Sequence, residues 1–202
     1  MADEDHPRAA EGEIPGGASI AAQAGTLAAA LGAGICRQTI ATTNIADVSN
    51  EAGDILTELE RIGETLRAAA GEETESEEQF RAALNQTAET EAEQLASNSA
   101  IEQSARATAG GAARTAEISL QTLELLGELS AICPAQSGGD LAAAAQLALT
   151  TMRGASYSLL GRLKFTGDAI YTHQRRREIE EALIRGQEIA DILEDKFLSQ
   201  NL

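Results

Sequence analysis

Apolar side chains recur at helical spacing along most of the chain. The clearest run is Val48, Ile55, Leu59, Ile62 and Leu66, which share one face of a helix. Strict alternation of apolar and polar residues, which is typical of a half-buried strand, is not visible in the sequence. The pattern therefore predicts an all-α fold, a compact bundle of about five to six helices over residues 19–39, 45–70, 72–109, 111–131, 140–163 and 168–198.

Two glycine turns each precede a predicted helix. The first is Pro-Gly-Gly at 15–17, and the second is "QSGGD" at 136–140. We expect Gly16 and Gly17 to use backbone dihedrals closed to other residues. Ser19 and Asp140 are the predicted N-caps of the helices that follow, because their side-chain oxygens can accept from free backbone N–H groups.

Other predicted boundaries lie in the polar middle of the chain. Gly71 is expected to end the second helix, and Thr74 or Ser76 to cap the third. A bend is expected around residues 97–99. Outside the helices, we predict a flexible acidic arm at 1–14, followed by a single domain over 15–202.

The first predicted helix consists almost wholly of Ala and Gly. Its bulky residues lie mostly on one stripe: Ile20, Leu27, Leu31 and Ile35. A glycine inside a helix costs roughly 1 kcal/mol relative to Ala. We therefore expect another backbone or a ligand to approach this helix closely at Gly25, Gly32 and Gly34.

The same stretch raises the question of a membrane span, because residues 18–36 carry no charge. A span needs about 20 mostly apolar residues, and it is usually flanked by an aromatic belt and basic residues. This stretch has few bulky side chains and neither of those flanks. We expect a core helix and no membrane partner.

Composition restricts the partners and the compartment. Among 202 residues, 32 Asp and Glu face 15 Lys and Arg, a formal net charge of -17. This argues against a nucleic-acid partner, which would require a cationic surface.

Cys36 and Cys133 give no disulfide framework and no secretory signal precedes them, so a cytoplasmic location is expected. Lysine occurs only at 164 and 196, and an acidic, lysine-poor surface suits a halophilic, high-salt cytosol.

Both glycine turns also carry a resemblance. "PGGAS" with the helix after it, "EEQFRAAL", the long "AIEQSARATAGGAARTAEISLQTLELLGEL" and "SGGD" resemble the cyclodeaminase/cyclohydrolase family. This family comprises the cyclodeaminase half of formiminotransferase-cyclodeaminase and the stand-alone methenyltetrahydrofolate cyclohydrolases. The resemblance covers about residues 14–198. It implies an all-helical homodimer that binds a reduced folate, a tetrahydrofolate derivative, with no metal or nucleotide.

Two reactions follow from the resemblance. The first is the cyclohydrolase step, hydrolysis of the methenyl bridge of methenyltetrahydrofolate, which we prefer because the chain stands alone. The alternative is ring closure of formiminotetrahydrofolate with loss of ammonia. The chain departs from the family pattern at several polar positions: Ala18, residues 39–44, Ser76, Ser158 and Arg162.

Candidate catalytic residues are the carboxylates Glu73 and Glu77, four residues apart on one helix stripe. A carboxylate can orient the attacking water, take its proton and return a proton to the leaving nitrogen. The alternative interpretation is an acidic first turn that only satisfies the helix dipole.

Candidate substrate-binding residues are Pro15, Gly16, Gly17, Ser19 and Asp140. The first turn can present backbone N–H groups to the pterin or to a carboxylate, or it can simply be a tight loop. Asp140 can accept from the pterin amino groups, or it can serve only as an N-cap.

Three further features have simpler interpretations. The basic cluster at 175–177 offers cations for a polyglutamate tail, but we expect it to pair with nearby acids on a solvated face. His6 and His173 have no companions at metal-ligand spacing, so no metal site is predicted. The Ala/Glu/Gln-rich stretch at 85–109 is also typical of signalling helices, so a helical scaffold or a folate binder without turnover stays as a further alternative.

The acidic composition gives a first testable prediction. We expect the free energy of unfolding to rise in molar KCl, because salt screens the repulsion among surplus carboxylates. This gain in stability is measured by thermal unfolding in dilute buffer and in ~2 M KCl, where the Debye length falls below about 3 Å. Full stability in dilute buffer would contradict the halophilic hypothesis.

Overall fold

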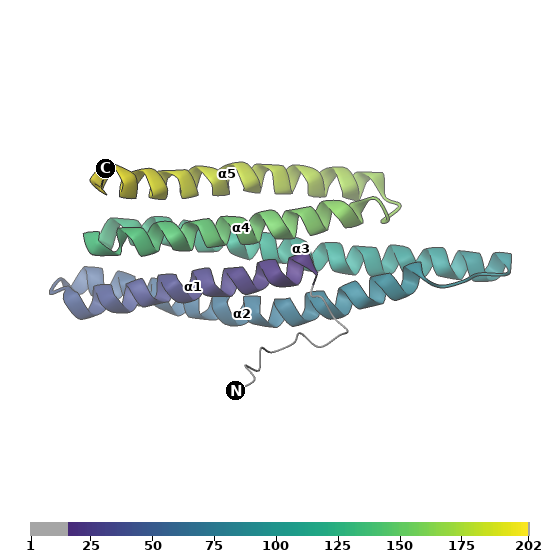
Figure 1. Ribbon diagram of the computed structural model, residues 1–202, viewed down its shortest axis with the longest axis horizontal. Coiled ribbons are helices and arrows are strands. Elements are labelled where there is room, and N and C mark those ends of the chain that lie inside the picture. Colours follow the sequence, from purple (N-terminus) through teal and green to yellow (C-terminus); the bar gives the residue numbers. More distant parts are fainter. Residues whose placement is uncertain (1–15, 202) are drawn as a thin grey trace, which may run out of the picture.

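The chain forms a bundle of long antiparallel helices, seen in the computed structural model, which describes residues 16–201 (Figure 1). Within that range the all-α prediction is confirmed, with five α-helices and no strand. The predicted acidic arm and Pro15 lie outside the described residues. The elements in order are α1 (Gly17–Thr42), α2 (Ala46–Leu84), α3 (Glu91–Ile132), the 3-10 turn η1 (Ala135–Ser137), α4 (Gly138–Leu163) and α5 (Ala169–Asn201).

Helices α1 to α4 form a four-helix bundle, with one helix at each corner of a square cross-section. α1 packs against α2 and α4, and α3 packs against the same two helices from the opposite corner. α5 then covers the α3–α4 side (Figure 1). The core inside the square is aliphatic, and its largest fully buried side chains include Leu59, Leu123, Leu126 and Met152.

The inner face of α1 is built from Ala and Gly. The predicted stripe of bulky residues on this helix faces partly toward solvent, since Ile20 is 53% and Leu27 61% exposed. The close approach expected at the glycines is confirmed at two of three. A Cβ on Gly25 would lie 2.8 Å from the Thr151 side chain, and one on Gly32 2.9 Å from Leu126. At Gly34 the prediction is wrong, because nothing lies within 4 Å and the residue faces outward.

Within the described residues, α1 is the one helix that is long and apolar enough to cross a membrane. More than half of its apolar window, 56%, is buried inside the bundle. Burial of this kind is the behaviour of a core helix.

Two predicted helix breaks are wrong. α2 runs through Gly71 to Leu84, so neither Thr74 nor Ser76 caps a helix. Gly71 has open space around it, while the buried side chains before and after it hold the helix in place: Leu66, Ala70, Phe80 and Ala83. Tertiary packing therefore overrides the local glycine penalty.

α3 is likewise continuous from Glu91, with no bend at 97–99 and no break near 110. The true connection lies at 85–90. It ends in a capping box, in which Thr90 accepts from the Glu93 N–H and the Glu93 carboxylate accepts from the Thr90 N–H.

The predicted helix caps also need correction. α1 begins at Gly17 with Gly16 as its N-cap, and Ser19 lies inside the first turn. α4 begins at Gly138 with Ser137 as its N-cap, so Asp140 is a first-turn residue. Gly16 has φ -63°, which any residue can adopt, so the expected special dihedrals are not used there. The single positive φ among the described residues belongs to Gly167.

The polar stretch at 85–109 forms a projecting hairpin. The end of α2 and the start of α3 extend beyond the other helices (Figure 1). Outward-facing polar residues are expected there because few other elements cover this part. The stretch is thus an arm of the bundle, and its composition alone does not indicate a scaffold.

Close packing between α1 and α4 gives a paired prediction. A Cβ on Gly154 would lie 2.6 Å from the Cβ of Ala21. We expect Gly154→Ala to destabilise the protein by about 1–3 kcal/mol, because the backbones must separate. Gly34→Ala adds the same methyl group in open space and should stabilise it by about 0.5–1 kcal/mol. Urea unfolding measures both, and equal effects would contradict the close-approach explanation.

Candidate functional site

A cavity lies where α1 begins beside the middle of α2. Among the described residues α1 begins at Gly17, and its first turn lies beside the C-terminal parts of α2 and α4. The cavity measures about 300 Å³ and is called the α1 cavity below. Its lining comes from three helices and the turn before α1: Gly16, Gly17, Ala18, Ser19, Glu73, Glu77, Arg81, Gly154, Tyr157, Ser158 and Arg162.

Hydrogen bonds fix the start of α1 against α2. The Ser19 hydroxyl donates to the Ala70 carbonyl at 2.8 Å, and the Thr74 hydroxyl donates to Ser19 Oγ at 3.1 Å. Among residues 16–201 no side chain caps this helix end, and its first turn contains no acidic residue. Its first backbone N–H groups and the positive end of the helix dipole can bind a polar ligand group in the cavity.

Glu73 is a buried carboxylate without a hydrogen-bond partner. Its side chain comes from α2, and the residue is 4% exposed. Neither carboxylate oxygen has a hydrogen-bond partner among the described residues. A Cβ built on Gly111 of α3 would lie 2.9 Å from Glu73 Oε1, so a side chain at that position would require the end of the Glu73 side chain to shift.

This environment changes the acidity of Glu73. Burial raises its pKa from 4.5 to about 7, because the charged form loses its hydration. The guanidinium groups of Arg114 and Arg162 oppose the rise, and the neighbouring carboxylates of Glu77 and Glu72 add to it. The result is a carboxyl group that can give or take a proton near neutral pH, as general acid–base catalysis requires.

Glu77, one turn further along α2, has the opposite environment. Its Oε1 accepts from Arg81 Nε at 3.1 Å, and its Oε2 accepts from Arg162. Arg162 in turn lies over the Phe80 ring, 4.4 Å from its centroid, and Phe80 meets Phe165 edge-to-face at 5.2 Å. Glu77 therefore orients Arg162 and is occupied as an ion-pair partner, which leaves Glu73 as the better acid–base group.

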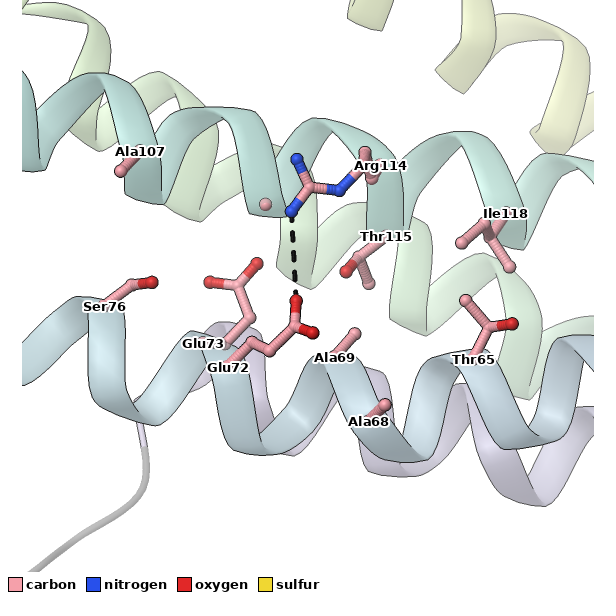
Figure 2. A pocket seen from close by; sticks show the side chains of 11 residues that line it. Thr65, Ala68, Ala69, Glu72, Glu73, Ser76, Ala107, Arg114, Thr115 and Ile118 are labelled. Atoms are coloured by element: carbon pink, nitrogen blue, oxygen red, sulfur yellow. Dashed lines mark ion pairs between the residues drawn. The ribbon is translucent and has the colours of Figure 1, made fainter.

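A second cavity lies between α2 and α3 and also reaches Glu73. It measures about 260 Å³ and is called the α3 cavity below. Figure 2 shows Glu72 and Glu73 extending from α2 toward Arg114 on α3. Arg114 and Glu72 form an ion pair of 4.0 Å. Thr115, which also lines this cavity, has a buried hydroxyl with no partner among the described residues.

The structure brings together five of the seven predicted site residues. They line the α1 cavity: Gly16, Gly17, Ser19, Glu73 and Glu77. Asp140 lies near the other end of α4 from Ser158, and the separation of eighteen positions corresponds to about 27 Å of helix. Within this chain Asp140 therefore does not line the α1 cavity, and Pro15 lies outside the described residues.

The departures from the family pattern are divided among different places. Ser158 and Arg162 line the α1 cavity, as does Ala18. Ser76 lines the α3 cavity. Thr39 is buried near the far end of α1, where its hydroxyl donates to the Ile35 carbonyl, well away from both cavities.

Sequence reasoning missed three residues that line the α1 cavity: Arg81, Gly154 and Tyr157. Ser158 and Arg162 were noted only as departures from the family pattern. Gly154, Tyr157 and Ser158 recur at helical spacing, which marks a common face of α4. That face can be assigned to a site only once α1 and α2 are placed beside it, so no local signal identifies it.

The basic cluster at 175–177 agrees with its simpler interpretation. Arg175 pairs with Glu178 at 2.8 Å, and Arg177 pairs with Glu181 at 3.1 Å, which confirms the expected ion-paired face. Among residues 16–201, no group of three or more His, Cys, Asp or Glu side chains could hold a metal ion.

Comparison with known proteins gives one family and one related fold. The sequence model of the formiminotransferase-cyclodeaminase family matches residues 7–181, well over half of the chain. The curated proteins give no match. The fold is similar to the crystal structure of formiminotetrahydrofolate cyclodeaminase from Thermotoga maritima, with 18% sequence identity, a TM-score of 0.84, and coverage of 96% of this chain and 93% of that chain. At this identity the likeness shows the fold alone.

The buried charge predicts a pH-dependent stability difference. Because the pKa of Glu73 is raised from 4.5 to about 7, its contribution to stability is fully present below pH 4.5 and lost as the pH rises through about 7. Glu73→Gln removes the ionised form, so at pH 8 it should be more stable than the native protein, by up to about 3 kcal/mol. The difference should shrink toward pH 4.5, as followed by urea unfolding across this range.

Glu77→Gln is the matched comparison, with the same chemical change one turn along α2. It deprives the mostly buried guanidinium of Arg162 of its charged partner. We expect it to destabilise the protein at pH 8 by about 1–3 kcal/mol. If both substitutions shift stability in the same direction, the contrast between the two carboxylates is wrong.

Proposed function

The chain belongs to the formiminotransferase-cyclodeaminase family, and from that premise we propose that it closes the ring of formiminotetrahydrofolate with loss of ammonia. The family implies a tetrahydrofolate substrate. Both the family description and the similar solved structure name a cyclodeaminase. They favour this alternative over the cyclohydrolase that we preferred from the sequence.

The observation that carries the proposal is the unpartnered, buried carboxyl group of Glu73. Cyclodeamination needs a group that first takes a proton and then returns it within one turnover. A carboxyl whose pKa is about 7 is poised for both transfers at neutral pH. Glu77, held by two guanidinium groups, keeps Arg162 at the cavity wall.

A single carboxylate is sufficient for both proton transfers of the proposed reaction. The substrate enters as its amidinium ion, N5–CH=NH2+, with a proton on N10. N10 forms a bond to the formimino carbon while the Glu73 carboxylate takes the N10 proton. The neutral adduct then receives that proton on its amino nitrogen, the C–N bond breaks with its electron pair going to nitrogen, and ammonia and the methenyl cation result.

The α1 cavity also supplies groups that suit the non-reacting parts of the folate. The backbone N–H groups at the start of α1 suit the carbonyl or a carboxylate of the folate. Arg162 and the more exposed Arg81 offer cations for anionic parts of the ligand. The exposed Tyr157 ring at the wall supplies a surface for a flat pterin.

We propose in addition that the protein acts as a cytoplasmic homodimer. The exposed Ile20 and Leu27 on the outer face of α1 support a second copy at that face. Two free cysteines, Cys36 buried and Cys133 half-buried, suit a reducing compartment.

The decisive assay follows the absorbance of the methenyl product from formiminotetrahydrofolate. We expect acceleration over buffer and a kcat/KM that rises as the pH increases through about 7, because the first step needs the Glu73 carboxylate. Glu73→Gln should lower kcat by about 10²–10⁴-fold. Faster hydrolysis of methenyltetrahydrofolate, without cyclodeamination, would instead support the cyclohydrolase.

Glu75→Gln is the control for this substitution. Glu75 lies two residues away on α2, is exposed, and lines neither cavity. Its loss of charge should leave kcat within about twofold, because surface charges act weakly. If kcat falls equally in both variants, Glu73 is not the acid–base group.

A further inference from the structure

Glu73 lies between two cavities, and the proposed folate site uses only one of them. The α1 cavity contains the start of α1, whereas the α3 cavity opens between α2 and α3. Glu73 contributes to the lining of both. A product formed at Glu73 therefore has two possible exits, and a folate occupying the α1 cavity would close one of them.

The polar groups of the α3 cavity suit a small ligand with several N–H donors. Both oxygens of Glu73 and the hydroxyl of Thr115 are buried and unpaired among the described residues. All three are hydrogen-bond acceptors, and a buried acceptor without a partner is costly. The cavity volume of about 260 Å³ easily holds a small ion with its waters.

The charges at this cavity favour a cation. Glu72 and Glu73 provide two carboxylates, and Arg114 provides one guanidinium, whose closest approach to Glu72 is 4.0 Å. Figure 2 shows all three facing the space between α2 and α3. With Glu73 ionised, the cavity keeps a surplus negative charge, which attracts a monovalent cation.

We propose that the α3 cavity is the ammonium site of this protein, through which the amino product leaves. This inference rests on the proposed cyclodeaminase function. The protonated Glu73 transfers its proton to the amino nitrogen of the adduct, and the C–N bond pair leaves with ammonia. Ammonia takes a further proton from solvent, and the resulting ammonium ion is held by the carboxylates of Glu73 and Glu72 and by the Thr115 hydroxyl before it is released between α2 and α3.

Binding can be tested without turnover. Ammonium chloride and tetramethylammonium chloride are titrated at constant ionic strength, and the carboxyl-carbon NMR signal of Glu73 is followed, assigned by its absence in Glu73→Gln. We expect a saturable shift with ammonium and none with tetramethylammonium, which has no N–H donor. Equal responses to the two salts, or no response to ammonium, would overturn the proposal.

Two substitutions locate the site. Thr115→Val removes a hydroxyl acceptor without changing the side-chain shape, and Ala107→Leu fills the α3 cavity from the α3 side. Each should weaken ammonium binding at least about fivefold. Ala143→Leu, an exposed change on α4 outside both cavities, is the matched control and should leave it unchanged. Unaltered ammonium binding in Ala107→Leu and Thr115→Val would place the ion elsewhere and reject the assignment.

Kinetics separates this inference from the proposed function. In an active enzyme, ammonium should inhibit noncompetitively against the folate, and Ala107→Leu should raise its inhibition constant at least about fivefold without changing the folate KM. Inhibition competitive with the folate would place ammonium in the α1 cavity and overturn the inference. If the NMR shift is present but no cyclodeamination is detected, the proposed function fails while the cation site stands.

Discussion

The close approach of α1 to its neighbours is the constraint on which the rest of the structure depends. Gly25 and Gly32 leave no room for a Cβ against α2, α3 and α4, and Gly154 leaves none against α1. Each glycine weakens its own helix by roughly 1 kcal/mol, so the helix persists because the tight contacts supply dispersion energy across its whole inner face. This packing fixes where α1 begins along α2. The first turn of α1 then forms the α1 cavity together with the C-terminal parts of α2 and α4.

The two carboxylates on α2 show how burial assigns different roles to identical side chains. Glu77 is surrounded by the guanidinium groups of Arg81 and Arg162 and has no free oxygen. Glu73, one turn earlier, is covered by α1 and α3 and has no hydrogen-bond partner among the described residues. An unpaired buried carboxylate is destabilising, and its position at the boundary between two cavities is the observation on which the proposed proton-transfer role rests. Gly111 lies against this carboxylate, and a Cβ there would require the end of the Glu73 side chain to shift.

Much of the fold could be predicted from the sequence, and the errors have a common physical cause. The helical period identified the α-helical class, and the resemblance pointed to the family. Gly71 was expected to end a helix, yet α2 continues because Leu66, Ala70 and Phe80 are buried on either side of it. The outward position of Leu27 was also unexpected. Both errors arise because local propensity is weaker than tertiary burial.

The sequence by itself determined the all-α class and the small-residue character of α1, and it offered Gly16, Gly17, Glu73 and Glu77 as candidate site residues. Only the tertiary structure decided that Asp140 lies far from the start of α1, that Arg162 holds Glu77, and that Glu73 is the carboxylate left without a partner. The physical reason is that periodicity and turn chemistry are properties of neighbouring residues. Burial, and the pKa that follows from it, depends on which distant helices cover a side chain.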